Sequence, residues 1–173
     1  MGCSKVNRAE DLPAAMVGAF AYGPVAVIES FVEGIEVTVA VVDRGEGPKA
    51  LPVVEIRPDS GVYDYSSRYT AGETRFLCPA EVSDDIADRC AELALRIHEV
   101  LGLSDLSRTD LIIDADGTPV FLEVNVAPGM TETSSVPLAI EAAGWSLGKM
   151  CADLVQVATL RGGRIRAAVQ TAV

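Results

Sequence analysis

Two β-rich runs on either side of the dipeptide Asp116-Gly117 constrain the fold of this chain more than any other feature. The runs cover Thr109–Asp114 and Pro119–Asn125. Asp-Gly between apolar runs is a strong hairpin signal, because both central residues of a type I′ turn need a positive φ. If these two residues form the loop, the register of the hairpin is fixed. The sequence therefore predicts an antiparallel hairpin with a definite pairing of its strands.

The predicted register gathers polar side chains on one face of this hairpin. Its cross-strand pairs are Ala115 with Thr118, Ile113 with Val120, Asp110 with Glu123, and Arg108 with Asn125. Directly opposed residues share a face, and so do residues two apart on one strand. Two opposed carboxylates repel unless a cation lies between them, and oxygen ligands of this kind suit Mg²⁺ or Mn²⁺. The face is thus predicted to be a hard-metal site beside an arginine; an exposed hairpin face with scattered charges is the alternative.

Composition and charge narrow the class of protein. The chain has 173 residues, of which 49% are apolar, and a formal net charge of −11. It is long enough to bury a core, and its acidity argues against a nucleic-acid partner. The cysteines show no C-x-x-C spacing, which indicates reduced thiols in a cytosolic protein. Because there is no long apolar run and no signal-peptide pattern, we expect a cytoplasmic location without a membrane partner.

Apolar periodicity places most strands before the helices. Strands are predicted at Val25–Phe31, Glu36–Asp43 and Leu51–Arg57, in addition to the hairpin. A long helix is expected between Ser83 as N-cap and Gly102 as the residue after its end, and a last helix from Leu147 to Gly162-Gly163. The tail 164–173 could fray or extend this last helix, and no structure is assigned to it. Strands joined by irregular loops, with helices grouped afterwards, predict an α+β fold with a mainly antiparallel sheet and packed helices.

Two side chains of the long predicted helix carry specific expectations. Cys90 falls on its apolar stripe and is expected to be buried as a small hydrophobe. His98 is the only histidine of the chain, and we expect it to be exposed or to cap the helix. Catalysis that depends on histidine is therefore not predicted.

Several motifs together resemble the D-alanine–D-alanine ligases of the ATP-grasp superfamily. In the order of that family they are Ile28–Gly34 with Glu36, Leu51–Ile56, Tyr63–Tyr65, Cys78–Ala80, Arg108-x-Asp110, Leu122–Thr131 and Ser134. The chain has neither a Walker-type motif nor Gly-x-Gly-x-x-Gly, so a P-loop or Rossmann domain is not predicted. The resemblance implies the C-terminal lobe of an ATP-grasp fold.

The resemblance also implies which residues hold the metal. Asp110, Glu123 and Asn125 match the family's ligands for two Mg²⁺ ions, or Mn²⁺ in their place, that bridge the phosphates of ATP. This agrees with the face derived from the hairpin register. Removing either carboxylate is expected to abolish Mg–ATP binding and to leave the fold intact.

The family's nucleotide site can be carried over in the same way. The matching positions are Glu29, Ser30, Phe31 and Val32 for adenine, Glu36 for ribose, and Arg68 for the phosphates. Without the resemblance, the two glutamates would be taken as solvated strand ends. Arg68 stands where the family usually has lysine, and Val62 where an aromatic residue is common, so phosphate placement and lid packing stay open. Both lie in the polar stretch 58–75, which resembles the family's lid.

Four residues match positions that act on the substrates. Arg108 corresponds to the residue that stabilises negative charge on the acyl phosphate and the tetrahedral intermediate, and the N–H of Gly129 to its companion donor. Ser134 corresponds to the residue that holds the carboxylate of the second D-alanine at the start of a helix over 136–143. A plain N-cap is the alternative for Ser134, and the two roles are compatible. Tyr69 matches the tyrosine associated with dipeptide formation.

The resemblance finally implies a domain division and a function. Residues 1–24 correspond to a remnant of the central ATP-grasp subdomain, 25–162 to the C-terminal lobe, and 163–173 to a tail. The family's N-terminal and central domains, through which its members often form homodimers, are not represented, so we expect a truncated chain that is inactive alone. The implied reaction joins two D-alanines through an acyl phosphate, with ATP, to give D-alanyl-D-alanine for peptidoglycan. The alternatives are a related ATP-grasp ligase for other amino or hydroxy acids and a non-catalytic nucleotide-binding fragment.

Overall fold

A six-stranded antiparallel sheet forms the body of the protein. The computed structural model describes residues 2–58 and 74–171, with side chains through 162. The strands are β1 (Ile35–Asp43), β2 (Pro48–Ala50), β3 (Val54–Pro58), β4 (Thr74–Leu77), β5 (Leu106–Ile113) and β6 (Pro119–Asn125). Their order is β4-β3-β1-β5-β6, with β2 paired to the end of β1. The predicted α+β fold with an antiparallel sheet is confirmed.

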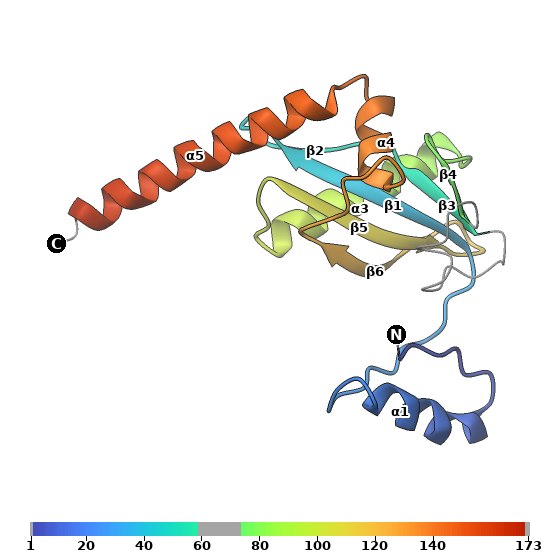
Figure 1. The fold of residues 1–173 in the computed structure, drawn as a ribbon. Helices are drawn as coiled ribbons and strands as arrows, with labels where there is room; N and C mark the ends of the chain where they lie inside the picture. The colour runs from blue at the N-terminus through green and yellow to red at the C-terminus, as the bar shows by residue number, and fades with distance from the viewer. Residues whose placement is uncertain (1, 59–73, 172–173) are drawn as a thin grey trace.

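Helices cover both faces of this sheet. The helices of the described residues are the short η1 (Ala9–Asp11), α1 (Leu12–Phe20), α3 (Asp84–Val100), α4 (Ser135–Ala142) and α5 (Leu147–Thr171). Helix α3 lies on one face against β1, β5 and β6, whereas α4 contacts β1 and β3 (Figure 1). Helix α1 stands away from the sheet, and α5 projects beyond it (Figure 1). Among the described residues, no helix has the length and apolarity that a membrane crossing requires.

Strand β1 is buried on both faces and joins the two layers of the core. Its odd-numbered residues from 37 to 41 pack in one cluster with Cys90 and Ala94 of α3. Its residues 40 and 42 pack in the other cluster, with Val136 and Ile140 of α4. Burial of a valine or isoleucine side chain contributes about 1.5–3 kcal/mol, so this strand anchors both helices. The predicted burial of Cys90 is confirmed.

The ends of α3 are those that the sequence predicts. Ser83 occupies the N-cap position with an extended backbone. Gly102 follows the helix at φ 61°, and its N–H donates to the carbonyl of Glu99 at 2.9 Å. The N–H of Leu103 donates to the carbonyl of His98 at 2.9 Å, which completes a Schellman motif. The glycine is needed because a left-handed φ is strained for other residues.

Two predicted elements are wrong. Val25–Phe31 is not a strand but part of an irregular segment, in which Val25 and Val27 are 78% and 77% exposed. A strand needs a neighbour for its N–H and C=O groups, and no described strand pairs with this segment. The second error is the helix end expected at Gly162-Gly163, because α5 continues to Thr171, which is the extension into the tail that the sequence left open. A helical glycine costs about 1 kcal/mol relative to alanine, which lowers stability without dictating an end.

His98 is buried, contrary to the prediction. Its side chain is 3% exposed, and its Nδ1 lies 2.8 Å from Oγ of Ser107 on β5. It follows Cys90 and Ala94 at intervals of four residues, and all three face the sheet. Burial lowers the pKa of His98 below its ordinary value, while the charges of Asp43 and Asp105 act in the opposite direction. The neutral imidazole is therefore the form that fits the core.

Acid should destabilise the fold through this histidine. In the unfolded chain the imidazole of His98 binds a proton at about pH 6.5, whereas in the folded chain it does so only at a lower pH. The free energy of unfolding therefore falls as the pH drops through this window. His98→Asn keeps a hydrogen-bonding group near Ser107 and cannot become charged. We expect the free energy of unfolding of the variant to change less than that of the parent between about pH 7 and pH 5.5 in urea titrations. Equal pH slopes would contradict this assignment.

Candidate active-site face of the sheet

The strand register brings the predicted metal ligands to one face. Asp110 pairs with Glu123 and Arg108 with Asn125 across β5 and β6, as the sequence predicts. Because opposed residues share a face, all four side chains project from the same side. On β1 this face continues through Glu36, whose partner on β5 is residue 112. We call these five residues, Glu36, Arg108, Asp110, Glu123 and Asn125, the carboxylate face.

The turn of the hairpin differs from the prediction. Its loop has three residues, since the N–H of Asp114 donates to the carbonyl of Thr118 and Gly117 alone has a positive φ, of 74°. Oδ1 of Asp114 accepts from the N–H groups of Asp116 and Thr118 at 3.0 and 2.8 Å. A side chain that takes up loop N–H groups favours this wider turn. The predicted pairs 115 with 118 and 113 with 120 are therefore wrong.

A β-bulge at Leu122 cancels the one-residue change of register that the wider turn introduces. Leu111 pairs with Phe121, but the next residue on β5, Asp110, pairs with Glu123. Leu122 is thus an extra residue in β6. Without the bulge, the three-residue loop would set Asp110 opposite Leu122 and turn Glu123 to the α3 side, because a one-residue slip reverses every side chain. The predicted pairing of the two acids is correct because two local deviations compensate.

Asp110 and Arg108 form a bidentate ion pair within the carboxylate face. Nε and Nη2 of Arg108 each donate to one Asp110 oxygen at 2.8 Å. Asp110 is 5% exposed, whereas Glu123 is exposed. Charge-assisted hydrogen bonds of this kind stabilise by about 1.5–3 kcal/mol each. The two acids are therefore not equivalent: removing Asp110 should also destabilise the fold, which differs from the expectation drawn from sequence.

The donor set of this face fits Mg²⁺. Asn125 keeps its side-chain oxygen close to the backbone, where it accepts from the N–H of Ala127 at 2.9 Å. Within residues 2–58 and 74–162, no group of three or more His, Cys, Asp or Glu side chains is placed to hold a metal. Mg²⁺ typically binds one or two protein carboxylates and completes its shell with water and phosphate oxygens. Two acids and an amide on one face of the sheet fit that arrangement.

Thr38 adds a polar group to the same face. It is the β1 partner of Asp110, is 1% exposed, and its hydroxyl has no hydrogen-bond partner among the described residues. An unpaired buried polar group costs about 1–3 kcal/mol. The carboxylate face therefore has hydrogen-bonding capacity that the described residues leave unused.

The loop after β6 brings Ser134 to the start of α4. Ser134 occupies the N-cap position, but its side chain makes no capping hydrogen bond. Instead its Oγ accepts from the N–H of Thr131 at 3.2 Å and lies 2.9 Å from the Thr131 hydroxyl. The first N–H groups of α4 are thus left uncapped by this serine, and such groups attract anions. The N-cap position is confirmed, and the hydroxyl is used differently.

Gly129 packs closely against the side chain of Ser134. A Cβ at position 129 would lie 2.8 Å from Oγ of Ser134, closer than real Cβ atoms approach. The glycine therefore allows the loop to close on the serine hydroxyl. The resemblance assigns the N–H of Gly129 a donor role beside Arg108, and the side chain nearest to Gly129 in this structure is that of Ser134.

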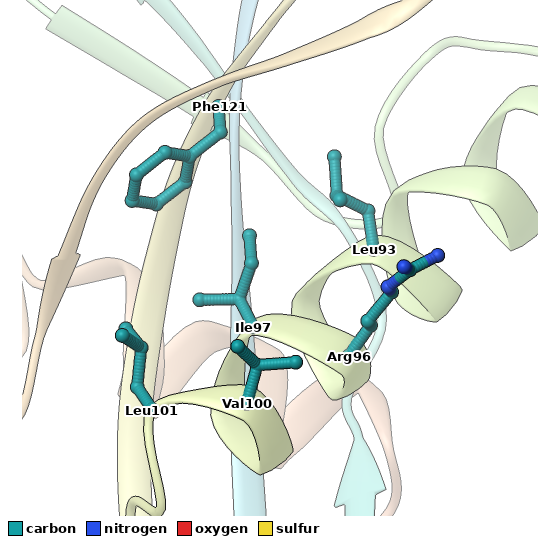
Figure 2. Close-up of a pocket in the computed structure, with 6 residues that line it drawn as sticks. All are labelled: Leu93, Arg96, Ile97, Val100, Leu101 and Phe121. Carbon is teal, nitrogen blue, oxygen red and sulfur yellow. The ribbon is translucent and has the colours of Figure 1, made fainter.

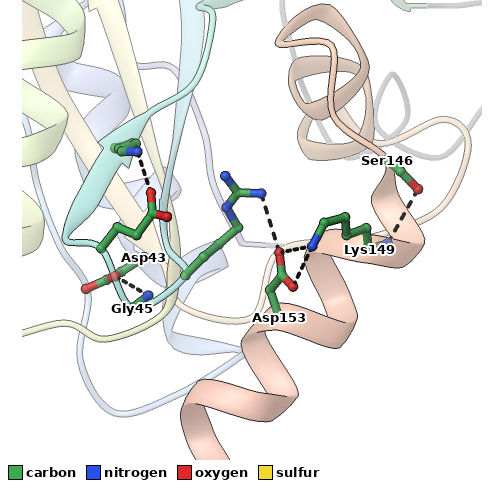
Figure 3. Close-up of polar contacts among 8 residues, drawn as sticks. Asp43, Gly45, Ser146, Lys149 and Asp153 are labelled. Atoms are coloured by element: carbon green, nitrogen blue, oxygen red, sulfur yellow. Dashed lines mark hydrogen bonds and ion pairs between the residues drawn. The ribbon is translucent and has the colours of Figure 1, made fainter.

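Contacts that the sequence did not predict fix the C-terminal end of α4, and we call the residues that make them, Arg44, Trp145, Lys149 and Asp153, the brace. Arg44, after β1, lies over the ring of Trp145 with 3.9 Å to its centroid and 3.4 Å from Asp153 of α5. Lys149 also contacts Asp153, at 3.0 Å, and Asp43 accepts from the N–H of Gly45 in the neighbouring turn (Figure 3). Cation–π contacts contribute about 0.5–2 kcal/mol. The brace holds the α4–α5 connection to the β1–β2 turn.

The predicted nucleotide residues are only partly placed. Glu36 is half-buried on the carboxylate face. Glu29 to Val32 lie in the irregular segment that leads to β1, where Phe31 is 56% exposed and the centroid of its ring lies 3.7 Å from Nζ of Lys5. Arg68, Tyr69 and Val62 lie outside the described residues.

An apolar groove lies on the other side of the sheet. It is formed by the C-terminal half of α3 and by Phe121 of β6 (Figure 2). Phe121 pairs with Leu111, which packs in the α3 cluster. The groove is therefore separate from the carboxylate face.

Comparison with known proteins identifies the family of this chain. The profile of the family described as D-ala D-ala ligase C-terminus matches residues 1–156. The chain belongs to this family. The D-alanine–D-alanine ligase of Bordetella petrii is 38% identical over 161 residues, which are 93% of this chain and 49% of that protein. The chain thus spans about half the length of the curated relatives it matches.

Solved structures of ligases have the same fold. The VanG D-Ala:D-Ser ligase from Enterococcus faecalis superposes with a TM-score of 0.78 at 33% identity, over 90% of this chain and 45% of that one. The D-alanine–D-alanine ligase from Bacillus anthracis, solved in complex with ATP, gives 0.75 at 27% identity, over 93% and 51%. The similarity to these D-alanine ligase structures supports the predicted ATP-grasp lobe.

The bulge should be dispensable for the pairing of the two acids. Deleting Leu122 leaves Asp110 opposite Glu123 in a regular ladder, whereas deleting Val124 moves Asn125 to the opposite face and removes a half-buried valine. We expect the first variant to keep the cross-strand nuclear Overhauser contacts between residues 110 and 123. The second should lose about 2 kcal/mol or more in urea unfolding. Similar losses in both deletions would contradict the role assigned to Leu122.

Proposed function

We propose that this chain is the C-terminal half of an ATP-dependent ligase that joins two D-alanines to form D-alanyl-D-alanine for peptidoglycan. The observation that carries the proposal is the single sheet face on which Arg108, two carboxylates and an amide meet, followed directly by the Ser134 loop. Membership of the ligase family and the names of the relatives support it. The other half of such an enzyme would supply the first D-alanine site and further contacts to ATP.

The residues of the carboxylate face would handle the phosphates. Asp110, Glu123 and Asn125 would hold two Mg²⁺ ions, which when bound neutralise charge on the transferred phosphoryl group. A carboxylate oxygen of the first D-alanine attacks the γ-phosphorus and displaces ADP, which forms the acyl phosphate. Arg108 is kept rigid by Asp110 and presents a permanent charge to the developing anion.

The loop from Gly129 to Ser134 would handle the second amino acid. The amine of this second amino acid attacks the carbonyl carbon of the acyl phosphate. Phosphate then leaves, and the amine loses a proton. The hydroxyl of Ser134 and the start of α4 would bind its carboxylate, and the N–H of Gly129 would donate to the tetrahedral oxyanion. The 33% identity to a D-Ala:D-Ser ligase makes D-serine the second candidate for this position.

The remaining assignments complete the proposal. Adenine would lie along Glu29, Ser30, Phe31 and Val32, ribose against Glu36, and the phosphates against Arg68, with Tyr69 near the second substrate. A cytoplasmic ligase that assembles as a homodimer through regions outside this chain would fit the family. These roles stay predictions.

Binding of Mn²⁺–ATP tests the proposed face directly. Glu123→Gln removes an exposed ligand charge without disturbing the Arg108–Asp110 pair. It should weaken Mn²⁺–ATP binding at least about tenfold, because even outer partners of a metal site change affinity 10–100-fold when mutated. Electron paramagnetic resonance of free Mn²⁺ measures this. Asp116→Asn, an equal charge change at the exposed turn, should bind like the parent.

Two results would overturn the proposal. One is a parent chain that binds no Mn²⁺–ATP, and the other is a Glu123→Gln variant that binds it as the parent does. Mixed with ATP and D-alanine, the isolated chain should release no phosphate in a coupled assay, because the first-substrate site is expected outside it.

A further inference from the structure

The loop between β6 and α4 contains a row of three hydroxyl groups. Oγ1 of Thr131 lies 3.3 Å from Oγ1 of Thr133 on one side and 2.9 Å from Oγ of Ser134 on the other. The N–H of Thr131 also donates to Oγ of Ser134 at 3.2 Å. Thr131 therefore contacts Ser134 through both its backbone and its side chain.

The hydrogen-bonding capacity of Ser134 gives this row a direction. A serine hydroxyl accepts two hydrogen bonds and donates one. The N–H of Thr131 occupies one acceptor position, because a backbone amide can only donate. If the Thr131 hydroxyl donates to the other, both acceptor positions of Ser134 are filled and its own hydrogen is left for a further acceptor. Thr133 can then donate to Thr131, and hydrogen bonds in such a chain strengthen one another.

The surroundings keep Ser134 in this arrangement. Its hydroxyl makes no capping bond to α4, which is the usual use of an N-cap serine. Gly129 closes the other side, where an added Cβ would meet the same oxygen at 2.8 Å. The hydroxyl is thus held between Thr131 and Gly129 at the start of a helix whose N–H groups favour anions.

We propose that Thr131 is a positioning residue that turns the Ser134 hydroxyl into a directed hydrogen-bond donor for the carboxylate of the second amino acid. The inference rests on the proposed function for the identity of that carboxylate. Thr131 itself does not touch the amino acid. Its effect is to fix the rotamer of Ser134 and to leave the serine hydrogen free for the ligand.

The rotamer of Ser134 tests the proposal without any ligand. Thr131→Val keeps the shape of the side chain and removes its hydroxyl, whereas Thr131→Ser keeps the hydroxyl. In the parent and in Thr131→Ser, three-bond couplings between the ¹⁵N and Hβ nuclei of Ser134 should report one rotamer. In Thr131→Val they should average over several. Thr159→Val, on the exposed face of α5, is the matched control and should behave like the parent. A single Ser134 rotamer in Thr131→Val overturns the proposal.

The effect of Thr131 on D-alanine binding can be tested by titration, with the amide signals of residues 134 and 135 as the reporters. Thr131→Val should weaken binding about tenfold, the loss typical of one hydrogen bond to a charged group. Thr131→Ser should stay within about twofold of the parent, as a conservative variant that restores the donor. In Ser134→Ala, D-alanine should no longer shift the amide signals of residues 134 and 135.

The results of the D-alanine titrations distinguish the role proposed for Thr131 from the role proposed for Ser134. If D-alanine binds the parent and Ser134→Ala abolishes binding while Thr131→Val does not weaken it, the role of Thr131 is wrong and that of Ser134 stands. If D-alanine shifts neither amide in the parent, the assignment of Ser134 in the proposed function fails, and the ligand role of Thr131 fails with it.

Discussion

The pairing of Asp110 with Glu123 across β5 and β6 is the constraint on which the candidate site depends. It sets two acids side by side on the edge strand β6 and its neighbour β5, in a sheet whose central strand is buried on both faces. The repulsion between them is reduced because Arg108 donates two hydrogen bonds to Asp110. The same contact holds the guanidinium on the face where a phosphate would arrive. One ion pair thus serves both the stability of the hairpin and the placement of a cation.

The elements that local chemistry determines were predictable from sequence. The Schellman glycine at 102 and the N-cap at 83 follow from short-range rules that need no partner. The elements that failed depend on distant partners. Val25–Phe31 has the composition of a strand but no described neighbour, and His98 is buried because β5 presents Ser107 to it. The four-residue spacing of positions 90, 94 and 98 was the available signal for that burial.

The candidate site shows the same division. The register of the two acids was predicted correctly from an incorrect turn, because the bulge at Leu122 is invisible to a rule that counts residues from Asp116-Gly117. The brace joins Arg44 to Trp145 and Asp153, more than a hundred residues away along the chain, so no spacing rule could reveal it. The contacts of Thr131 with Ser134 are local, but the hydroxyls of such a loop give no sequence signal that separates them from solvated groups.

The bulge at Leu122 also has a consequence for how the hairpin tolerates change. It divides the β5–β6 ladder into a segment next to the turn and a segment that carries the acids. A β-bulge accommodates one extra residue within a ladder, so a one-residue change of register in the first segment can be offset there. We therefore expect the exposed turn residues 115 and 116 to tolerate substitution better than the acids at the base of the hairpin.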